Sequence, residues 1–209
     1  MSDEIPEDLS QAKSAPEDRE INGPFDVSEA NAVRPYVDLG GVKIVPREGL
    51  HLRLEVEEGT KRVVAVGLDY AGSTLQVQPF AAPRSAGLWH EIRAQIADQI
   101  RRQGGTTREA AGPFGPELLA EIPVVAGPGQ APSTRLARFI GVDGPRWFLR
   151  GVIAGEGAVN PEAAGAIEDL FRSVVVVRGS TPMPPRDLIP LHVPAQAAGP
   201  SVGTPLSGV

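Results

Sequence analysis

Residues 134–155 read TRLARFIGVDGPRWFLRGVIAG, and this stretch predicts two antiparallel strands joined by a short turn. Asp143-Gly144 is the turn signal, because aspartate followed by glycine readily adopts the backbone of a two-residue hairpin loop. Both predicted strands are rich in large apolar residues, so we expect the hairpin to lie inside a sheet that is covered on both faces. A turn at this place would set three pairs of residues opposite one another: Ile140 and Trp147, Phe139 and Phe148, and Leu136 and Gly151.

Further strands are predicted on both sides of this hairpin. In LHLRLEV at residues 50–56, apolar and polar residues alternate strictly, which is typical of a half-buried strand. Short turns that contain glycine separate several of the other segments. These segments are 36–39 and 42–45 around Gly40-Gly41, 62–70 and 73–78 around Ala71-Gly72, 118–125, and the β-branched run 174–177.

Two segments have the pattern of helices. From residue 88 to 102, apolar residues recur every three or four positions, and Ser85 is placed to cap the start. The second helix is predicted to begin at Asn160-Pro161-Glu162, which combines a cap residue, a proline suited to the first turn and an acid. Because strands outnumber helices and most turns are short, the sequence predicts an α+β fold in which two main helices cover an antiparallel sheet.

The distribution of charged residues distinguishes an N-terminal tail from the rest of the chain. Residues 1–24 hold seven acids, two bases and few large apolar residues, so we expect a disordered acidic arm. From residue 25 onward, 19 acids nearly balance 18 bases, and a nearly neutral body is not expected to attract nucleic acid. The predicted domain covers residues 25–194, and residues 195–209 are predicted to form a second disordered tail.

The composition excludes several kinds of chemistry. The chain has no cysteine, which rules out thiolate catalysis, disulfides and thiolate metal sites. No run approaches the ~20 apolar residues of a membrane helix and no signal-peptide pattern is present, so we expect a cytoplasmic protein without a membrane partner. The histidines at 51, 90 and 192 lack a ligand spacing, and neither GxSxG nor a phosphate-binding glycine loop occurs. The sequence therefore predicts no catalytic residue, no metal ligand and no cofactor.

One group of residues has the chemistry of a binding surface. In the predicted hairpin, Arg135, Arg146 and Arg150 fall on the same face as Phe139 and Phe148. Several guanidinium groups around an aromatic pair can hold a carboxylate, a phosphate or an acidic segment of a partner protein. The alternative is that the arginine stems cover apolar surface while their charges pair with nearby acids, which gives them no role in binding.

Five segments together resemble a family of uncharacterised actinobacterial proteins that is classed as domain of unknown function 3710. They are GPFD at residue 23, VRPYVDLGGVKI at 33, WHEIRAQI at 89, GVDGPRWFLRGV at 141 and VVVVRGSTPMPPRDLIPL at 174, and the resemblance extends over residues 23–194. It implies no activity, because the family has no assigned one. The order of hairpin strands, helix, long hairpin, helix and final strand also resembles the PsbP-like sandwich, which implies an accessory or binding role.

Taken with the missing catalytic motifs, these features predict a non-enzymatic accessory or protein-interaction domain whose partner is another protein. Two alternatives stay open. The first is a binder of a small anionic ligand or nucleotide, and the second is an enzyme of unrecognised class, which a concave pocket with a carboxylate or histidine of shifted pKa would favour.

Overall fold

A computed structural model describes residues 10–194, which form an α+β fold with two sheets. The main sheet has seven strands, and every neighbouring pair is antiparallel. Their order across the sheet is β4 (His51–Val56), β5 (Val63–Tyr70), β6 (Ser73–Ala81), β10 (Trp147–Gly155), β9 (Ser133–Asp143), β8 (Gly115–Val124) and β7 (Thr106–Gly112). The predicted hairpin supplies β9 and β10, which are the central strands.

A smaller sheet of four short strands packs beside the main one. Its order is β1 (Phe25–Asp26), β11 (Val175–Val176), β3 (Val42–Ile44) and β2 (Val37–Asp38). The pairing of β1 with β11 is parallel, whereas the other two pairings are antiparallel. The predicted α+β class is confirmed, but the strands divide into two sheets where one was expected.

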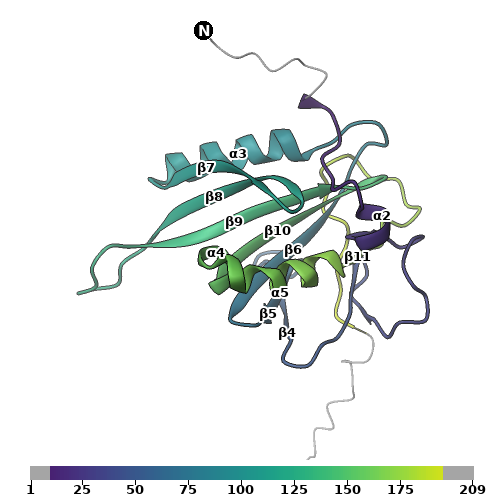
Figure 1. Cartoon of the computed structure of the whole chain (residues 1–209), viewed down its shortest axis with the longest axis horizontal. Helices are drawn as coiled ribbons and strands as arrows, with labels where there is room; N and C mark the ends of the chain where they lie inside the picture. The colour runs from purple at the N-terminus through teal and green to yellow at the C-terminus, as the bar shows by residue number, and fades with distance from the viewer. Residues whose placement is uncertain (1–9, 195–209) are drawn as a thin grey trace, which may run out of the picture.

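Helices lie on both faces of the main sheet, with α3 above it and α5 below it in Figure 1. On one face, α3 (Trp89–Arg102) packs on β7, β8 and β9, and the indole of Trp89 stacks on the ring of Phe148. On the other face, α4 (Glu156–Val159) and α5 (Pro161–Arg172) close a larger core, in which the rings of Phe114 and Phe171 meet edge to face at 4.9 Å. We refer to these two surfaces of the sheet as the α3 face and the α5 face. α3 packs over the β7 side of the sheet, and beyond it the α3 face of β4 and β6 carries polar side chains, among them Arg53, Glu55 and Gln76.

The hairpin prediction placed the turn two residues too early. Asp143 pairs with Phe148, and the backbone nitrogen of Gly144 donates to the carbonyl of Trp147, so the turn lies at Pro145-Arg146. The predicted pairs are therefore wrong: Ile140 lies opposite Gly151, Phe139 lies opposite Val152, and Leu136 pairs with Glu121 of β8. A shift of two residues preserves the side-chain alternation, so each residue keeps the face that was predicted for it.

The domain begins before residue 25, which corrects the predicted boundary of the acidic arm. Ser14 exchanges backbone and side-chain hydrogen bonds with Asp143 at 2.8 and 2.9 Å. Arg19, in the short helix α2 (Arg19–Asn22), is buried, forms an ion pair with Glu29 at 2.7 Å and lies over the ring of Trp147. Polar anchoring of this kind leaves no apolar pattern in the sequence. The predicted disorder of residues 1–9 and of the tail at 195–209 lies outside the described residues.

Most other predicted elements are present, and four were missed. The turns at Gly40-Gly41 and Ala71-Gly72 join β2 to β3 and β5 to β6, and the side chain of Asn160 caps α5 by accepting from the nitrogen of Glu162 at 3.0 Å. The elements that the sequence did not predict are α2, β1, β7 and α4. Ser85 does not cap α3. None of the helices in residues 10–194 is long and apolar enough to cross a membrane.

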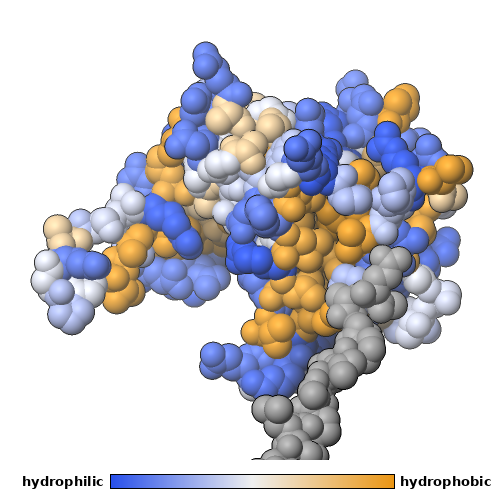
Figure 2. Space-filling view, turned by 90° about the horizontal axis from the view of Figure 1, so that it is seen from below, coloured by the Kyte–Doolittle hydropathy of each residue, from blue (hydrophilic) through white to orange (hydrophobic). Residues whose placement is uncertain are grey.

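The connection between β8 and β9 projects from the body. It extends to the left of Figure 1 and forms the lobe at the left of Figure 2, where hydrophobic residues gather at the centre of the face. Val124 and Val125 of this projection are 44% and 94% exposed.

Candidate functional site

The part of the α3 face that α3 leaves open forms a groove of about 480 Å³. Strands from both halves of the sheet line it, because β10 brings β4, β5 and β6 next to β9 and β8. Apolar side chains, among them Phe139, Ile122 and Val152, alternate with polar ones. The polar members that matter for the chemistry are Arg53, Glu55, Gln76, Arg135 and Arg150.

Arg150 is the central charged group of this groove. It lies on β10 opposite Gln78 of β6, and its guanidinium donates to the side-chain oxygen of Gln78 and lies 5.8 Å from the centre of the Phe80 ring. Burial lowers the pKa of Arg150, although an arginine stays charged at neutral pH. Within residues 10–194 it makes no ion pair with a carboxylate, and its buried Nε has no hydrogen-bond partner. A positive charge withdrawn from water without a counter-charge is costly, so this guanidinium is well suited to receive an anion.

Neighbouring side chains hold Arg150 in place without neutralising it. The side-chain nitrogen of Gln78 donates to the carbonyl of Val64 at 2.8 Å, which fixes the amide so that its oxygen faces Arg150. The carboxylate of Glu55 accepts a hydrogen bond from Gln76. These contacts leave the positive charge of Arg150 without a counter-charge beside the groove.

The other two arginines of the groove differ in their partners. Arg53 forms a two-pronged hydrogen-bonded pair with Asp69 at 2.7 and 3.1 Å, and this pairing lowers the pKa of the Asp69 carboxyl. Arg135 is exposed and has no ion pair within residues 10–194. Because Asp69 already balances Arg53, the groove has the charges of Arg135 and Arg150 against that of Glu55. An anionic group with an apolar neighbour would fit this lining.

The structure brings together three of the five residues that the sequence singled out. Arg135, Phe139 and Arg150 line the groove. Arg146 does not, because it lies in the corrected turn and donates to the carbonyl of Gly179 at 3.0 Å. Phe148 is fully buried between the rings of Phe80 and Trp89, so it belongs to the core under α3. The predicted surface is therefore only partly correct as a geometric unit.

Sequence reasoning missed the polar residues that β4 and β6 contribute. Their signal was present, since the alternation in LHLRLEV and in STLQVQPF puts Arg53, Glu55, Gln76 and Gln78 on one side of their strands. The sequence did not reveal the order of the strands in the sheet. β6 lies beside β10, and 65 residues lie between Ala81 and Trp147, the paired residues that are closest in the sequence.

A second charged cluster lies on the α5 face and is structural. Arg138 is buried and donates to Glu117 at 2.9 Å and to Glu168 at 2.7 Å through one nitrogen, so it ties β8 and β9 to α5. No group of three histidine or acid side chains within residues 10–194 is arranged to hold a metal ion.

Comparison with protein families decides where the chain belongs. The model of the family described as "Protein of unknown function (DUF3710)" matches residues 23–199, which is most of the chain. The protein belongs to the DUF3710 family. No match was found for this DUF3710 protein among curated proteins or among solved structures. The matched range contains every residue that lines the groove.

Proposed function

We propose that this DUF3710 protein is a non-enzymatic accessory domain that binds an acidic segment of a partner protein in the groove on its α3 face. The observation that carries the proposal is Arg150, whose guanidinium is largely buried, faces the groove and has no carboxylate partner within residues 10–194. A carboxylate from a partner would supply the missing counter-charge to this guanidinium. Phe139 and Val152 give an apolar side chain of the same segment a surface to pack on.

A small anionic ligand is the second candidate, and the size of the groove favours it. Pockets that hold small molecules measure roughly 300 to 1,000 Å³, and the groove has about 480 Å³. The acidic segment and the small anion would both bind to the positive charge of Arg150. They differ in whether ligand contacts extend along the sheet beyond the groove.

The test compares two arginines that lie four residues apart. Arg150→Gln removes the groove charge, whereas Arg146→Gln removes an arginine that bonds a backbone carbonyl outside the groove. Binding of a peptide that alternates glutamate and leucine, and of ATP, would be measured by calorimetry for each protein. We expect Arg150→Gln to weaken binding by roughly tenfold or more, as for the loss of a charge-assisted hydrogen bond of about 1.5 to 3 kcal/mol. Equal binding by wild type and both variants would refute the groove as the binding surface.

Two further features stay proposals. We propose a cytoplasmic location, which the absence of cysteine supports. We also propose that the fold is a variant of the PsbP-like sandwich, as the order of elements suggests, which would agree with an accessory role. An actinobacterial source is proposed on the family resemblance alone.

A further inference from the structure

The strands under the groove already use their backbone hydrogen bonds within the sheet. β6, β10, β9 and β8 each have a paired strand on both sides. Their backbone N–H and C=O groups therefore bond to neighbouring strands, and the face of the sheet offers a ligand only side chains. An extended segment that lay on this face would leave the backbone groups that it buries without partners, whereas a helix bonds its backbone groups internally.

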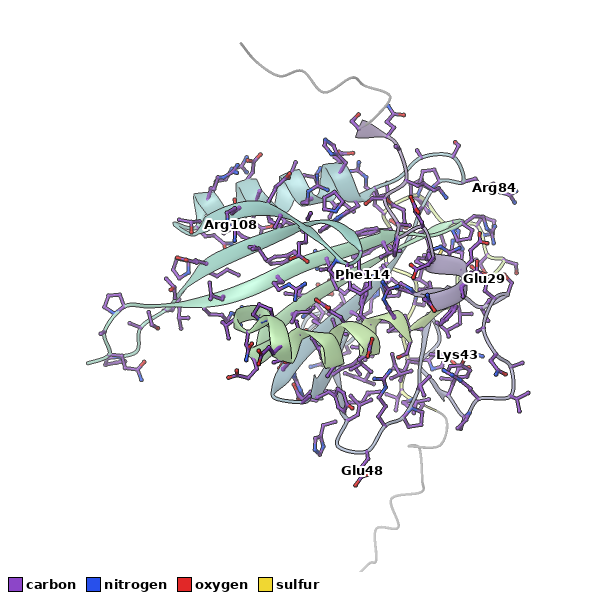
Figure 3. The ribbon with its side chains drawn as sticks, viewed as in Figure 1. Glu29, Lys43, Glu48, Arg84, Arg108 and Phe114 are labelled. Atoms are coloured by element: carbon purple, nitrogen blue, oxygen red, sulfur yellow. The ribbon has the colours of Figure 1, made fainter. Side chains whose placement is uncertain are left out.

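The sheet has room for one more helix beside α3. α3 packs on β7, β8 and β9, and Figure 1 shows that it runs along these strands. On one side α3 reaches β7, the edge strand, whose Arg108 is labelled in Figure 3, and on the other side the sheet continues through β10 and β6. Packed helices lie about 8 to 10 Å apart, and two strand spacings span about 9 to 10 Å. A helix beside α3 would therefore be centred two strands beyond β8, on β10.

Apolar side chains are available to such a helix. Val152 and Ala154 of β10 are partly buried and line the groove. Ile122 and Phe139 also line it, and both are partly buried and pack against the core under α3. This core therefore continues into the groove, where the apolar side chains of a bound helix would extend it.

The charged side chain of β10 lies at a spacing that suits a helix. Arg150 precedes Val152 by two residues, which is about 7 Å along a strand and close to the ~6 Å between residues i and i+4 of a helix. A glutamate of the helix and an apolar residue one turn later can therefore meet Arg150 and Val152. Arg135 adds a second positive charge to the groove and Glu55 one negative charge, so the lining favours a helix with an excess of acids.

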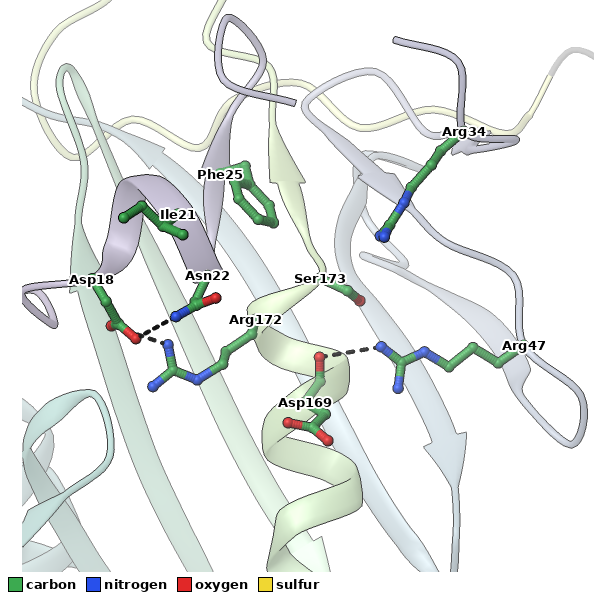
Figure 4. Close-up of a pocket in the computed structure, with 9 residues that line it drawn as sticks. All are labelled: Asp18, Ile21, Asn22, Phe25, Arg34, Arg47, Asp169, Arg172 and Ser173. Atoms are coloured by element: carbon green, nitrogen blue, oxygen red, sulfur yellow. Dashed lines mark hydrogen bonds and ion pairs between the residues drawn. The ribbon is translucent and has the colours of Figure 1, made fainter. Parts of the chain in front are cut away.

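A wider depression elsewhere is less suitable for an acidic helix. Figure 4 shows this depression of about 590 Å³ at the end of α5, where Asp18 and Asp169 lie among the arginines. Arg172 contacts the carboxylate of Asp18 at 3.4 Å, and Arg47 donates to the carbonyl of Asp169 at 3.2 Å. Acids of the protein itself thus offset part of the positive charge there, whereas Arg150 has no carboxylate partner within residues 10–194.

We infer that the partner segment in the groove is an acidic amphipathic helix that lies beside α3 and over β10. The inference rests on the proposed function, because it takes Arg150 as the group that receives a carboxylate of the partner. The apolar face of the helix packs on Phe139, Val152 and Ala154, and its glutamates face Arg150 and Arg135.

Two peptides of identical composition test the conformation of the bound segment. Both contain glutamate and leucine in equal numbers over about 18 residues, which make roughly five turns of a helix. In the first peptide the leucines fall on one face of a helix, and in the second glutamate and leucine alternate. Calorimetry with the full-length protein measures both affinities. We expect the helix-patterned peptide to bind at least tenfold more tightly, and Arg150→Gln to weaken it at least tenfold.

A matched pair of variants tests the position of the helix. Ala154→Trp should weaken the helix-patterned peptide at least tenfold, because the indole would occupy the path along β10. Ala111→Trp makes the same change at an exposed position of β7 outside the groove and should bind as wild type does. Binding that Ala154→Trp leaves unchanged would overturn this position.

The outcomes separate this inference from the function on which it rests. If the alternating peptide binds as tightly as the helix-patterned one, and Arg150→Gln weakens both, the helix is wrong and the proposed function stands. If Arg150→Gln weakens neither peptide, the proposed function fails, and the inference fails with it.

Discussion

Asp143→Ala should destabilise the protein, because this carboxylate joins three parts of the chain. Asp143 is 2% exposed, and its two oxygens accept from the backbone nitrogens of Leu88 at 2.8 Å and Ser14 at 2.9 Å, with a longer contact from Trp89 at 3.5 Å. It therefore caps the start of α3 from another strand and holds the N-terminal segment on the hairpin.

The size of the loss follows from these contacts. Two hydrogen bonds to a charged acceptor contribute about 1.5 to 3 kcal/mol each, and removal of the acceptor leaves buried donors unsatisfied. The substitution also removes the cost of keeping a charged carboxylate away from water, which offsets part of this loss. We therefore expect the free energy of unfolding to fall by about 2 to 4 kcal/mol. Urea unfolding at neutral pH measures it as a lower midpoint with an unchanged slope. Asp98→Ala, at an exposed position of α3, is the control and should stay within about 0.5 kcal/mol of wild type.

The effect should also depend on pH. Burial raises the pKa of Asp143 above its ordinary value of 3.8, against the opposing effect of its backbone hydrogen bonds. Between these two pKa values the unfolded chain has lost the proton that the folded chain keeps, so the stability contributed by Asp143 decreases as pH rises. The difference in unfolding free energy between wild type and Asp143→Ala should therefore be larger at acid pH than at pH 7. A difference that is near zero, or that grows as pH rises, would refute this account of Asp143.

Two other substitutions test the corrected parts of the fold. Arg19→Gln removes the ion pair with Glu29 and should lower the free energy of unfolding by about 1 to 3 kcal/mol. The loss is smaller than for a fully buried pair because Glu29 is partly exposed. As a control, Arg101→Gln breaks an exposed ion pair and should lower the free energy of unfolding by less than about 1 kcal/mol. A melting temperature unchanged by Arg19→Gln would show that the N-terminal segment is not part of the domain. Trp147→Ala empties a fully buried site and should cost about 3 to 5 kcal/mol, while Trp147→Phe, which loses the hydrogen bond to Asp26, should cost less. Similar unfolding midpoints for wild type and Trp147→Ala would contradict the burial of the indole.

Local patterns in the sequence were enough to predict which face each hairpin residue occupies. Alternation fixes the face, so Ile140 and Trp147 lie together on the α5 face although they are not paired. The turn position was not predictable from Asp143-Gly144, because Asp143 bonds Ser14 and Leu88 and continues β9. Contacts between segments far apart in the chain overrode the local turn signal.

For the candidate site too, local sequence patterns predicted one part, and the other part depended on contacts between distant segments. The sequence identified Arg135, Phe139 and Arg150 as one face of a ribbon, and this placement is correct. Nothing in the sequence indicates that Phe139 and Phe148 differ in burial. In the structure, α3 covers Phe148 completely but leaves Phe139 partly exposed. The position of a covering helix depends on the tertiary packing of α3 on β7, β8 and β9, which a single-strand pattern does not contain.

The most direct test of the proposed binding role is the NMR signal of the Arg150 Nε–Hε group in the wild-type protein. The guanidinium of Arg150 lines the groove and has no carboxylate partner within residues 10–194, so an anion bound there would change the surroundings of this signal. During titration with the glutamate and leucine peptide, we predict that the Arg150 signal shifts and saturates, while the Arg146 signal stays in place. An Arg150 signal that does not move, or arginine signals that all shift alike in proportion to peptide charge, would contradict the proposal.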